Sequence, residues 1–597
     1  MLSMVLAVAS PTIQYRVSMP QPTNHRFEIE AEVNGELGYC FELKMAVWTP
    51  GSYLVREYSR HIQDFAVRDA NGISVPWKKI AKNHWRLDTQ SIQAPIVFSY
   101  SLYANELTVR TNHLDRTHGY LNGASTFLYI PGQESAPIDV TIVLPEENVL
   151  PGENWTIATT LPEISPNTFR AKDFDTLVDS PFEIGLHSKF EFEVLGKPHE
   201  WVIWGKGNVD PTQLILDTQK IIETEAKLFG GLPYDRYLFL LHLSNGYGGL
   251  EHRDSCSLIF SRNGFKKRES YEDFLTLVAH EFFHLWNIKR IRPKALETFD
   301  YDGENYTPSL WFSEGATSFY DNLIPLRAGL YDAKTYLKNM SKSITRYLTT
   351  PGRSVQPLSE SSFDAWIKLY RPDTNTPNSQ MSYYLKGEMV TFLLDLAVRR
   401  RHENTRSFDD VMRKLWIEFG QSADGEIGFT PGDLKRTIES VAEFDLTSFF
   451  SKYIDGLMDL PFQAALADFG LTLESNLSQK HPPVHGARVV LENGKTLIKY
   501  VASKSPAEQA GLDAGDELVA IDGLRINPEL LNDRLHASQA GDTLEISFFH
   551  QDELLQTVLT LGEPEATQYT IVPLKDPTEA QRKRFQDWLG ILLDELK

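Results

Sequence analysis

Residues 277–286, LVAHEFFHLW, contain the pattern H-E-x-x-H within a stretch of helical periodicity. Apolar Phe274, Val278 and Phe282 recur at steps of four, which predicts a helix with one buried face. Ser270 is its expected N-cap, because a hydroxyl there can accept from the backbone N–H groups of the first turn. This helix is predicted to organise the catalytic part of the chain.

The two histidines of the pattern have the spacing of metal ligands. Residues four apart lie on one face of a helix, so His280 and His284 can approach one zinc ion at ~2.0–2.1 Å. Glu281 then lies beside the metal, where a carboxylate can take a proton from water. The alternative is a pair of core histidines, but a helical H-E-x-x-H arises by chance only rarely, so zinc chemistry is the preferred interpretation.

A third ligand must come from elsewhere in the chain. Catalytic zinc sites use three protein ligands and leave one position for water, and the glycine and third histidine of metzincins do not follow His284. Thr307-Pro308 predicts the start of a second helix, on which Glu314 could be that ligand. By itself, Glu314 could also be a solvated surface acid.

The N-terminal part of the chain has the pattern of β-structure. Residues 27–33 and 96–100 alternate apolar and polar positions, and turn pairs such as Asn71-Gly72 separate such runs. Residues 1–200 are therefore predicted to form an all-β domain, and the close spacing of turns favours a sandwich.

Helical periodicity begins after residue 205. A helix is predicted over residues 211–229, a strand over 237–243, and then a glycine-rich loop over 246–249. Residues 201–330 are expected to form an α+β catalytic domain. Residues 331–462, with long helical patterns, are expected to form a helical lobe.

The last part of the chain resembles a PDZ domain of the bacterial type, on the segments SPAEQAGL at 505–512 and GDELVAIDG at 515–523. We assign residues 463–565 to this module and 566–597 to a C-terminal tail or helix. PDZ domains add an extended peptide to a sheet edge and capture its carboxylate, for which 469–473 is the candidate loop and strand. Packing of the module on the catalytic domain is an equal alternative.

The composition of the chain bears on its binding partners and on its cellular location. The formal charge of −21 over 597 residues disfavours nucleic acid and anionic membranes. No apolar run reaches the ~20 residues of a membrane-spanning helix. The opening MLSMVLAVAS lacks the basic start of a secretory signal, so we expect a cytoplasmic protein.

The segment WFSEG at 311–315 resembles the downstream glutamate helix of gluzincins, the group that includes thermolysin and aminopeptidase N. The chain as a whole resembles the glycyl aminopeptidase family of that group. The resemblance covers nearly the full length, through WTPGSYLVREY at 48–58, GGLEH at 248–252, HEFFHLWNIKRIRP at 280–293 and the PDZ module.

This resemblance implies a multidomain fold, with a β-rich N-terminal domain, a thermolysin-like α+β catalytic domain, a helical lobe and a mainly β PDZ domain. It implies one Zn²⁺ per chain, held by His280, His284 and Glu314. It also implies exopeptidase activity on peptides with a free amino end, often with a small first residue such as glycine or alanine.

Residues 248–252 are similar to the G-x-M-E-N loop of aminopeptidase N relatives. By that likeness Glu251 binds the α-ammonium of the substrate, and Gly248 and Gly249 permit close approach of the backbone. His252 stands where the relatives have asparagine, so the resemblance implies no role for it. A turn without a catalytic role is the alternative.

Residues 382–387, SYYLKG, resemble the Y-x-K-G segment of the same relatives, whose tyrosine stabilises the oxyanion. Tyr384 is the candidate, with Tyr383 as the less favoured one, and either could be only a packed aromatic residue. Arg290 and Arg292 are expected to pair with acidic groups rather than to bind substrate.

These observations predict a zinc aminopeptidase with Glu281 as general base and Tyr384 as oxyanion donor. The same zinc centre would also serve an endopeptidase. A different class of function is a peptide-binding protein with a PDZ domain and a vestigial metal site. The presence of Glu281 together with the complete ligand set disfavours this alternative.

Overall fold

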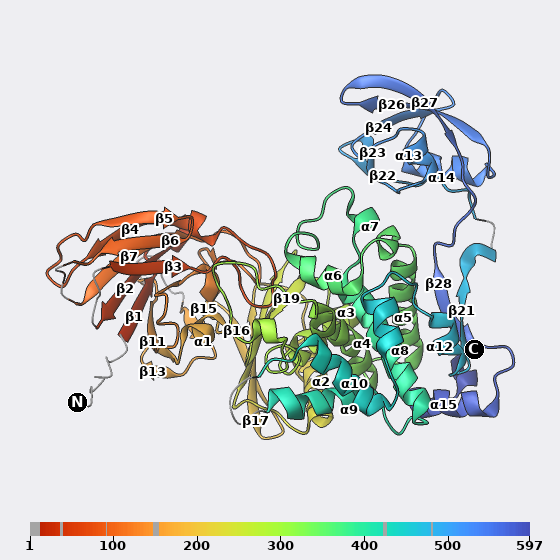
Figure 1. Cartoon of the computed structure of the whole chain (residues 1–597). Coiled ribbons are helices and arrows are strands. Elements are labelled where there is room, and N and C mark those ends of the chain that lie inside the picture. Colours follow the sequence, from red (N-terminus) through yellow and green to blue (C-terminus); the bar gives the residue numbers. More distant parts are fainter. Residues whose placement is uncertain are drawn as a thin grey trace, which may run out of the picture. The chain divides into compact units, whose positions relative to one another are not determined.

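The computed structural model of the chain (Figure 1) describes residues 12–35, 40–90, 92, 94–146, 154–421, 427–478 and 481–596. It comprises two compact units: the first contains residues 1–305 and 419–428, and the second 306–418 and 429–597. In the part of the chain with described coordinates, no helix is long and apolar enough to cross a membrane.

Three β-sheets form the N-terminal part of the first unit. Alternate residues of β1 and β2 are buried, as the alternating pattern predicts. The seven-stranded sheet has the order β13 (Glu163–Ser165), β14 (Thr168–Ala171), β11 (Ile138–Val143), β1 (Thr12–Ser18), β2 (Arg26–Asn34), β7 (Ile96–Tyr103) and β4 (Ile62–Arg68). The second sheet has the order β10 (Leu128–Tyr129), β3 (Cys40–Met45), β6 (His84–Asp88) and β5 (Trp77–Ala81). The third has the order β12 (Thr156–Ala158), β15 (Phe182–Gly185), β9 (His118–Leu121) and β8 (His113–Leu114). The predicted β-rich N-terminal domain is confirmed.

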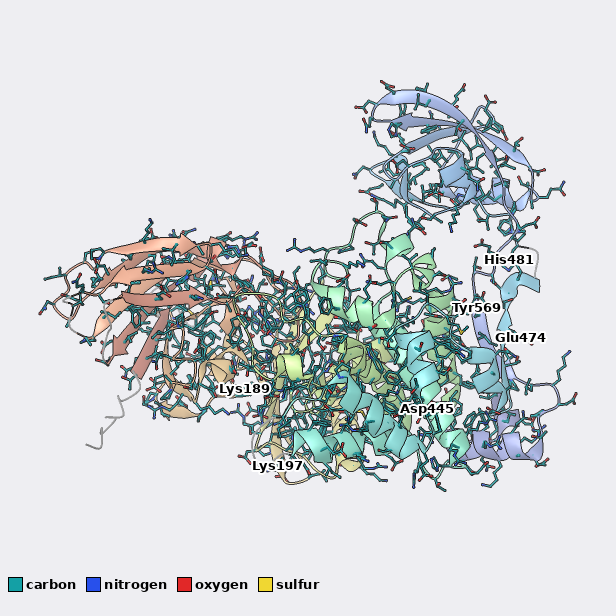
Figure 2. All side chains as sticks on the ribbon, viewed as in Figure 1. Lys189, Lys197, Asp445, Glu474, His481 and Tyr569 are labelled. Atoms are coloured by element: carbon teal, nitrogen blue, oxygen red, sulfur yellow. The ribbon has the colours of Figure 1, made fainter. Side chains whose placement is uncertain are left out.

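A mixed five-stranded sheet follows in the first unit. Its order is β16 (Ser188–Val194), β17 (Lys197–Trp204), β18 (Tyr237–Ser244), β20 (Ser255–Ser261) and β19 (Gly248–Glu251). The parallel pair β17 and β18 is joined through helix α2 (Pro211–Phe229). Lys189 on β16 and Lys197 on β17 mark its outer hairpin in Figure 2.

Local signals define α2 and β18 as the sequence predicts. Asp210 accepts hydrogen bonds from the backbone N–H groups of Thr212 and Gln213, and Gly230 ends the helix at φ +83°. All but the last residue of β18 are buried, which is expected for an apolar strand in the middle of a sheet.

Helices dominate the second unit, which confirms the predicted helical region. A π-helix, η5 (Trp311–Ala316), continues into α4 (Thr317–Arg327), and α8 (Tyr383–Arg401) is buried on nearly all sides. The other helices include α5 (Ala333–Leu348), α6 (Leu358–Phe363), α9 (Phe408–Leu415) and α10 (Pro431–Ala442). A π-helical turn, Trp416–Gly420, follows α9 directly.

The PDZ-like sheet has the order β22 (Ala487–Glu492), β23 (Lys495–Val501), β24 (Glu517–Ile521), β26 (Thr543–His550) and β27 (Glu553–Thr560), with a hydrophobic core of its own. β21 (Leu471–Ser475) does not belong to this sheet. It pairs instead with β28 (Tyr569–Pro573), after the module in sequence.

The paired strands β21 and β28 hold the two ends of the PDZ segment together. Figure 2 labels Glu474 and Tyr569 on them. The backbone N–H of Tyr569 donates to Thr345 Oγ1 at 2.9 Å, and that of Ile571 donates to Ser341 Oγ at 3.0 Å, both on α5. Residues 469–473 are therefore wrong as the strand of a carboxylate-binding loop, because β28 and α5 hold β21 outside the PDZ sheet.

Candidate active site

Helix α3 (Arg268–Phe283) carries the H-E-x-x-H pattern in the first unit. It begins at Arg268, and its N-cap Lys267 makes no side-chain cap, so the expected cap at Ser270 is wrong. An acid in the first turn and the ion pair of Arg268 with Glu272 at 2.6 Å stabilise this end instead. The predicted apolar face is buried, with Phe282 stacked on Phe239 of β18.

The two histidines lie next to each other at the end of α3. Their ring centroids are 4.6 Å apart and the rings are almost perpendicular. His284 is fully buried, and its Nδ1 lies 2.7 Å from the backbone oxygen of Asn287. Because a carbonyl can only accept, this bond places the proton on Nδ1 and gives Nε2 the lone pair that a metal requires.

Glu281 is held against the backbone of β19. A Cβ atom at Gly249 would stand 2.1 Å from Glu281 Oε1 and 2.2 Å from its Cδ. Ligand-type atoms of Glu281, Glu251 and His284 all lie within 4.8 Å of one another. The structure thus brings the predicted base, one predicted ligand and the predicted ammonium-binding carboxylate together inside the first unit.

Gly248 to Glu251 form strand β19 at the edge of the sheet, rather than the loop predicted over 246–249. Pairing with β20 therefore fixes these residues, with Gly249 opposite Leu258 and Glu251 opposite Cys256. Arg110 Nη2 donates to the oxygen of Gly249 at 3.1 Å. A strand places Glu251 more rigidly than a loop would.

Gly51 lies directly against the Glu251 carboxylate. A Cβ at Gly51 would come within 2.5 Å of both carboxylate oxygens, and its φ of +87° is one that favours glycine. Gly51 belongs to the segment 48–58 that resembles the family, but no role could be predicted for it from the sequence. The Pro50-Gly51 pair predicts a turn, but a turn gives no information about a partner ~200 residues further along the chain.

A cavity of about 480 Å³ opens beside Glu251 within the first unit. Its apolar wall includes Trp48, Tyr53, Ile288 and Phe299. Acidic and basic side chains, among them Asp179 and Lys289, also line this open cavity, which has the size of a small-ligand site next to a buried carboxylate.

His252 and Arg290 make structural contacts. His252 is buried, with Nδ1 3.3 Å from Asp179 Oδ1 and Nε2 3.4 Å from Ser257 Oγ. Arg290 donates to Asp254 at 2.9 Å, the acidic pairing that its sequence context predicts. Arg292 donates to the backbone oxygen of Lys289 at 2.8 Å.

Glu314 lies in the π-helix η5 of the second unit and is 1% exposed. It is therefore not the solvated acid that its position alone allowed. The following residue, Gly315, packs on α8 so closely that a Cβ there would stand 2.4 Å from Gly387 Cα. Two glycines thus permit η5 to approach α8.

Tyr384 lies in the first turn of α8, within the same unit as Glu314. Burial, followed by the negative charge of Glu314, raises the pKa of the Tyr384 hydroxyl well above its ordinary value. The hydroxyl therefore keeps its proton and can donate a hydrogen bond. Tyr384 remains partly accessible, whereas Tyr383 is fully buried and stacks on it at 4.7 Å.

Three parts of the chain match known protein families. Residues 14–186 match the Peptidase M61 N-terminal domain, residues 273–390 match M61 glycyl aminopeptidase, and residues 483–561 match a PDZ domain. A crystal structure of an aminopeptidase N family protein from Idiomarina loihiensis is 32% identical, with a TM-score of 0.89, over 97% of this chain and 100% of that one.

An M1 zinc metallopeptidase from Deinococcus radiodurans is 12% identical, with a TM-score of 0.45, over 76% of this chain and 95% of that one. Among curated proteins there is no match.

Proposed function

Because this chain belongs to the M61 glycyl aminopeptidase family, a family of zinc metallopeptidases, we propose that it removes the first residue from peptides with a free amino end. We further propose that glycine or alanine is the favoured first residue. The observation that carries the proposal is the buried carboxylate of Glu251, which packs closely against Gly51 and lies beside Glu281 and His284.

We propose that His280, His284 and Glu314 hold one catalytic zinc. Two imidazoles and a carboxylate are the ligand types of hydrolytic zinc sites. The Nδ1 contact of His284 with the Asn287 carbonyl is the outer hydrogen bond that such ligands typically make. When bound, zinc would polarise the scissile carbonyl and lower the pKa of a water molecule towards ~7.

The chain's own groups would divide the remaining work. Glu281 would take the proton of the attacking water and deliver it to the leaving amine. Tyr384, whose raised pKa keeps it protonated, would donate to the developing oxyanion. Gly249 leaves space for the Glu281 carboxylate at the backbone of β19.

Glu251 would set the position of cleavage. A carboxylate that pairs with the α-ammonium allows only the first peptide bond to reach the base. The neighbouring cavity would receive the first residue or its amino end. Because Glu251 is only 4% exposed, an uncharged amino terminus would leave this carboxylate without the cation it requires.

The PDZ domain is proposed to bind an extended peptide or a protein C-terminus along a sheet edge.

The test is a panel of aminoacyl arylamides on the purified full-length protein, each with its amino group free and acetylated. We expect turnover of the glycyl and alanyl compounds, slower turnover of those with large side chains, and none after acetylation. Equal cleavage of free and acetylated substrates would replace the aminopeptidase with an endopeptidase. A preference for large residues would contradict only the proposed specificity.

A further inference from the structure

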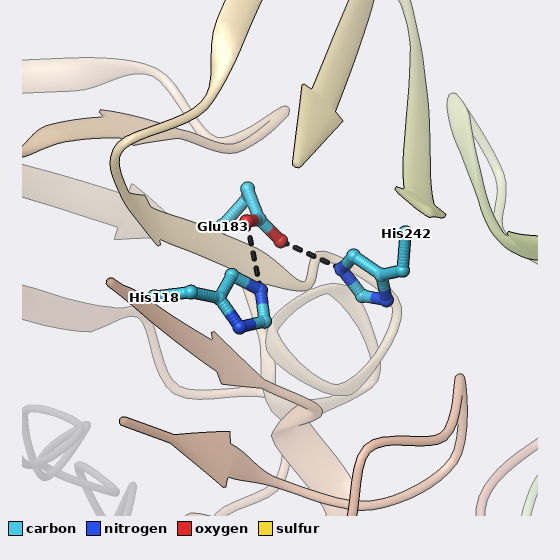
Figure 3. A group of neighbouring side chains, drawn as sticks. All are labelled: His118, Glu183 and His242. Atoms are coloured by element: carbon cyan, nitrogen blue, oxygen red, sulfur yellow. Dashed lines mark hydrogen bonds and ion pairs between the residues drawn. The ribbon is translucent and has the colours of Figure 1, made fainter. Parts of the chain in front are cut away.

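A second cluster of metal-ligating side chains lies in the first unit. It consists of His118 on β9, Glu183 on β15 and His242 on β18, which face one another in Figure 3. Their exposed fractions are 0%, 1% and 0%. One ligand-type atom from each lies within 4.8 Å of the other two.

One carboxylate faces both imidazoles. His118 Nε2 lies 2.8 Å from Glu183 Oε1, and His242 Nε2 lies 2.9 Å from Oε2. The second contact is aligned as a hydrogen bond, but the first is not, so that His118 Nε2 and Glu183 Oε1 have no aligned hydrogen-bond partner. Buried polar atoms are seldom left in this state, and two that approach each other without an aligned hydrogen bond are suited to binding a common third atom.

The charge of the cluster also lacks a counterpart. Among the ion pairs of the described residues, Glu183 pairs with these two histidines and with no lysine or arginine. A carboxylate that is removed from water is costly unless a cation accompanies it. A divalent metal ion bound by these three side chains would supply that cation.

We propose that His118, Glu183 and His242 bind a second divalent metal ion, zinc or a similar first-row transition metal. Imidazole and carboxylate are the ligands that such ions take, and both oxygens of Glu183 with the two Nε2 atoms make four donors. His118 stacks on Trp204 at 4.2 Å, and Tyr120 meets His242 edge-on at 4.9 Å. Aromatic walls and full burial leave no place for substrate, which makes this a structural site.

The position of the cluster explains what such an ion would do. Strands β9 and β15 belong to a sheet of the N-terminal domain, and β18 is the central strand of the five-stranded sheet. Near the cluster, Tyr120 also bonds across to Ser257 Oγ at 2.8 Å. The ion would therefore fasten the N-terminal domain to the sheet that carries Glu251.

Metal analysis of the full-length protein tests this proposal. The protein is purified from zinc-supplemented medium without chelator, and its zinc, iron, nickel, cobalt and manganese are quantified per chain. We expect about two ions in the wild type, rather than the one that the H-E-x-x-H pattern predicts, and about one in His118→Gln. His280→Ala should also lose one ion, from the catalytic site.

The matched control is His113→Gln. His113 is also buried, with its ring centroid 5.3 Å from that of His118, but it pairs with Asp115 and lies outside the ligand set, so this variant should keep both ions. One ion in the wild type and none in His280→Ala would overturn the proposal, as would equal metal content in wild type and folded His118→Gln. If His118→Gln fails to fold, the comparison of wild type with His280→Ala still decides.

Discussion

Gly249 on β19 and Glu281 on α3 lie in direct contact, so close that a Cβ at position 249 would stand 2.1 Å from Glu281 Oε1. The backbone of Gly249 is not in the left-handed region, so space rather than conformation requires glycine here. The missing side chain of Gly249 thus leaves room at the sheet edge for the carboxylate that we propose as the general base.

Gly249→Ala should therefore impair catalysis without removing the metal. Its methyl group would push the Glu281 carboxylate away from its position, and a displacement of about 1 Å can cost roughly 10²-fold in rate. We expect a fall of about that size in kcat for a glycyl arylamide, with unchanged metal content. Wild-type kcat in this variant would show that the contact has no catalytic consequence.

Glu281→Gln should keep its metal and lose about 10²–10⁴-fold in kcat, because an amide cannot accept the proton of water. The double variant Gly249→Ala/Glu281→Gln should be no slower than Glu281→Gln alone, since both changes act through one carboxylate. Losses that multiply would mean that Gly249 acts by another route.

The sequence predicted those parts of the site that lie within one local pattern. Periodicity identified α2 and α3, and the spacing of His280 and His284 follows from the helix itself. The contact of Gly51 with Glu251 has no such signal, because it depends on how the turn at Gly51 packs against strand β19.

The same reason applies to the second histidine cluster and to the PDZ segment. His118, Glu183 and His242 come from three strands that are far apart in sequence, so only tertiary pairing unites them. Likewise, the local sequence of β21 resembles a PDZ strand. Its pairing with β28 is a long-range contact, which a local sequence pattern cannot predict.

Glu314→Ala should lose the catalytic metal ion, because a three-ligand site with one ligand removed binds zinc weakly. The expected result is a fall of about one metal equivalent per chain together with loss of arylamide turnover. The control is Glu304→Ala, which changes an exposed acid nearby in the sequence. This variant should keep its metal content and its arylamide turnover. Full metal retention in Glu314→Ala would remove it as the third ligand.

Glu388 predicts a specific pH dependence of stability. Its burial, and then the nearby charge of Asp321, raise the pKa of this carboxyl to about 8. The folded state thus holds a proton that the unfolded state releases above pH ~4.5, so the stabilising contribution is complete below that pH and is lost as pH rises towards 8.

Glu388→Gln should therefore reduce the fall in Tm between pH 5 and pH 8, because the amide stays neutral throughout. At pH 8 we expect it to stabilise by roughly 2–4 kcal/mol, less than the full shift implies. Scanning fluorimetry at both values measures this, with exposed Glu563→Gln as a control that should follow the wild type. A Tm profile of Glu388→Gln parallel to that of the wild type would contradict an uncharged Glu388.

Glu251 distinguishes an aminopeptidase from an endopeptidase with the same metal centre. If its carboxylate pairs with the α-ammonium, Glu251→Ala leaves a cation in a desolvated pocket without its partner. Breaking a buried charged pair costs about 3–5 kcal/mol, or roughly two to four decades in kcat/KM. We expect that loss for a peptide with a free amino end and no change in metal content. An acetylated peptide has no ammonium to bind, so wild type and Glu251→Ala should be equally poor on it, and the variant should lose its discrimination between the two peptides. A loss of the same size on both peptides would instead mean that Glu251 supports the fold or the base, and that recognition of the amino end lies elsewhere.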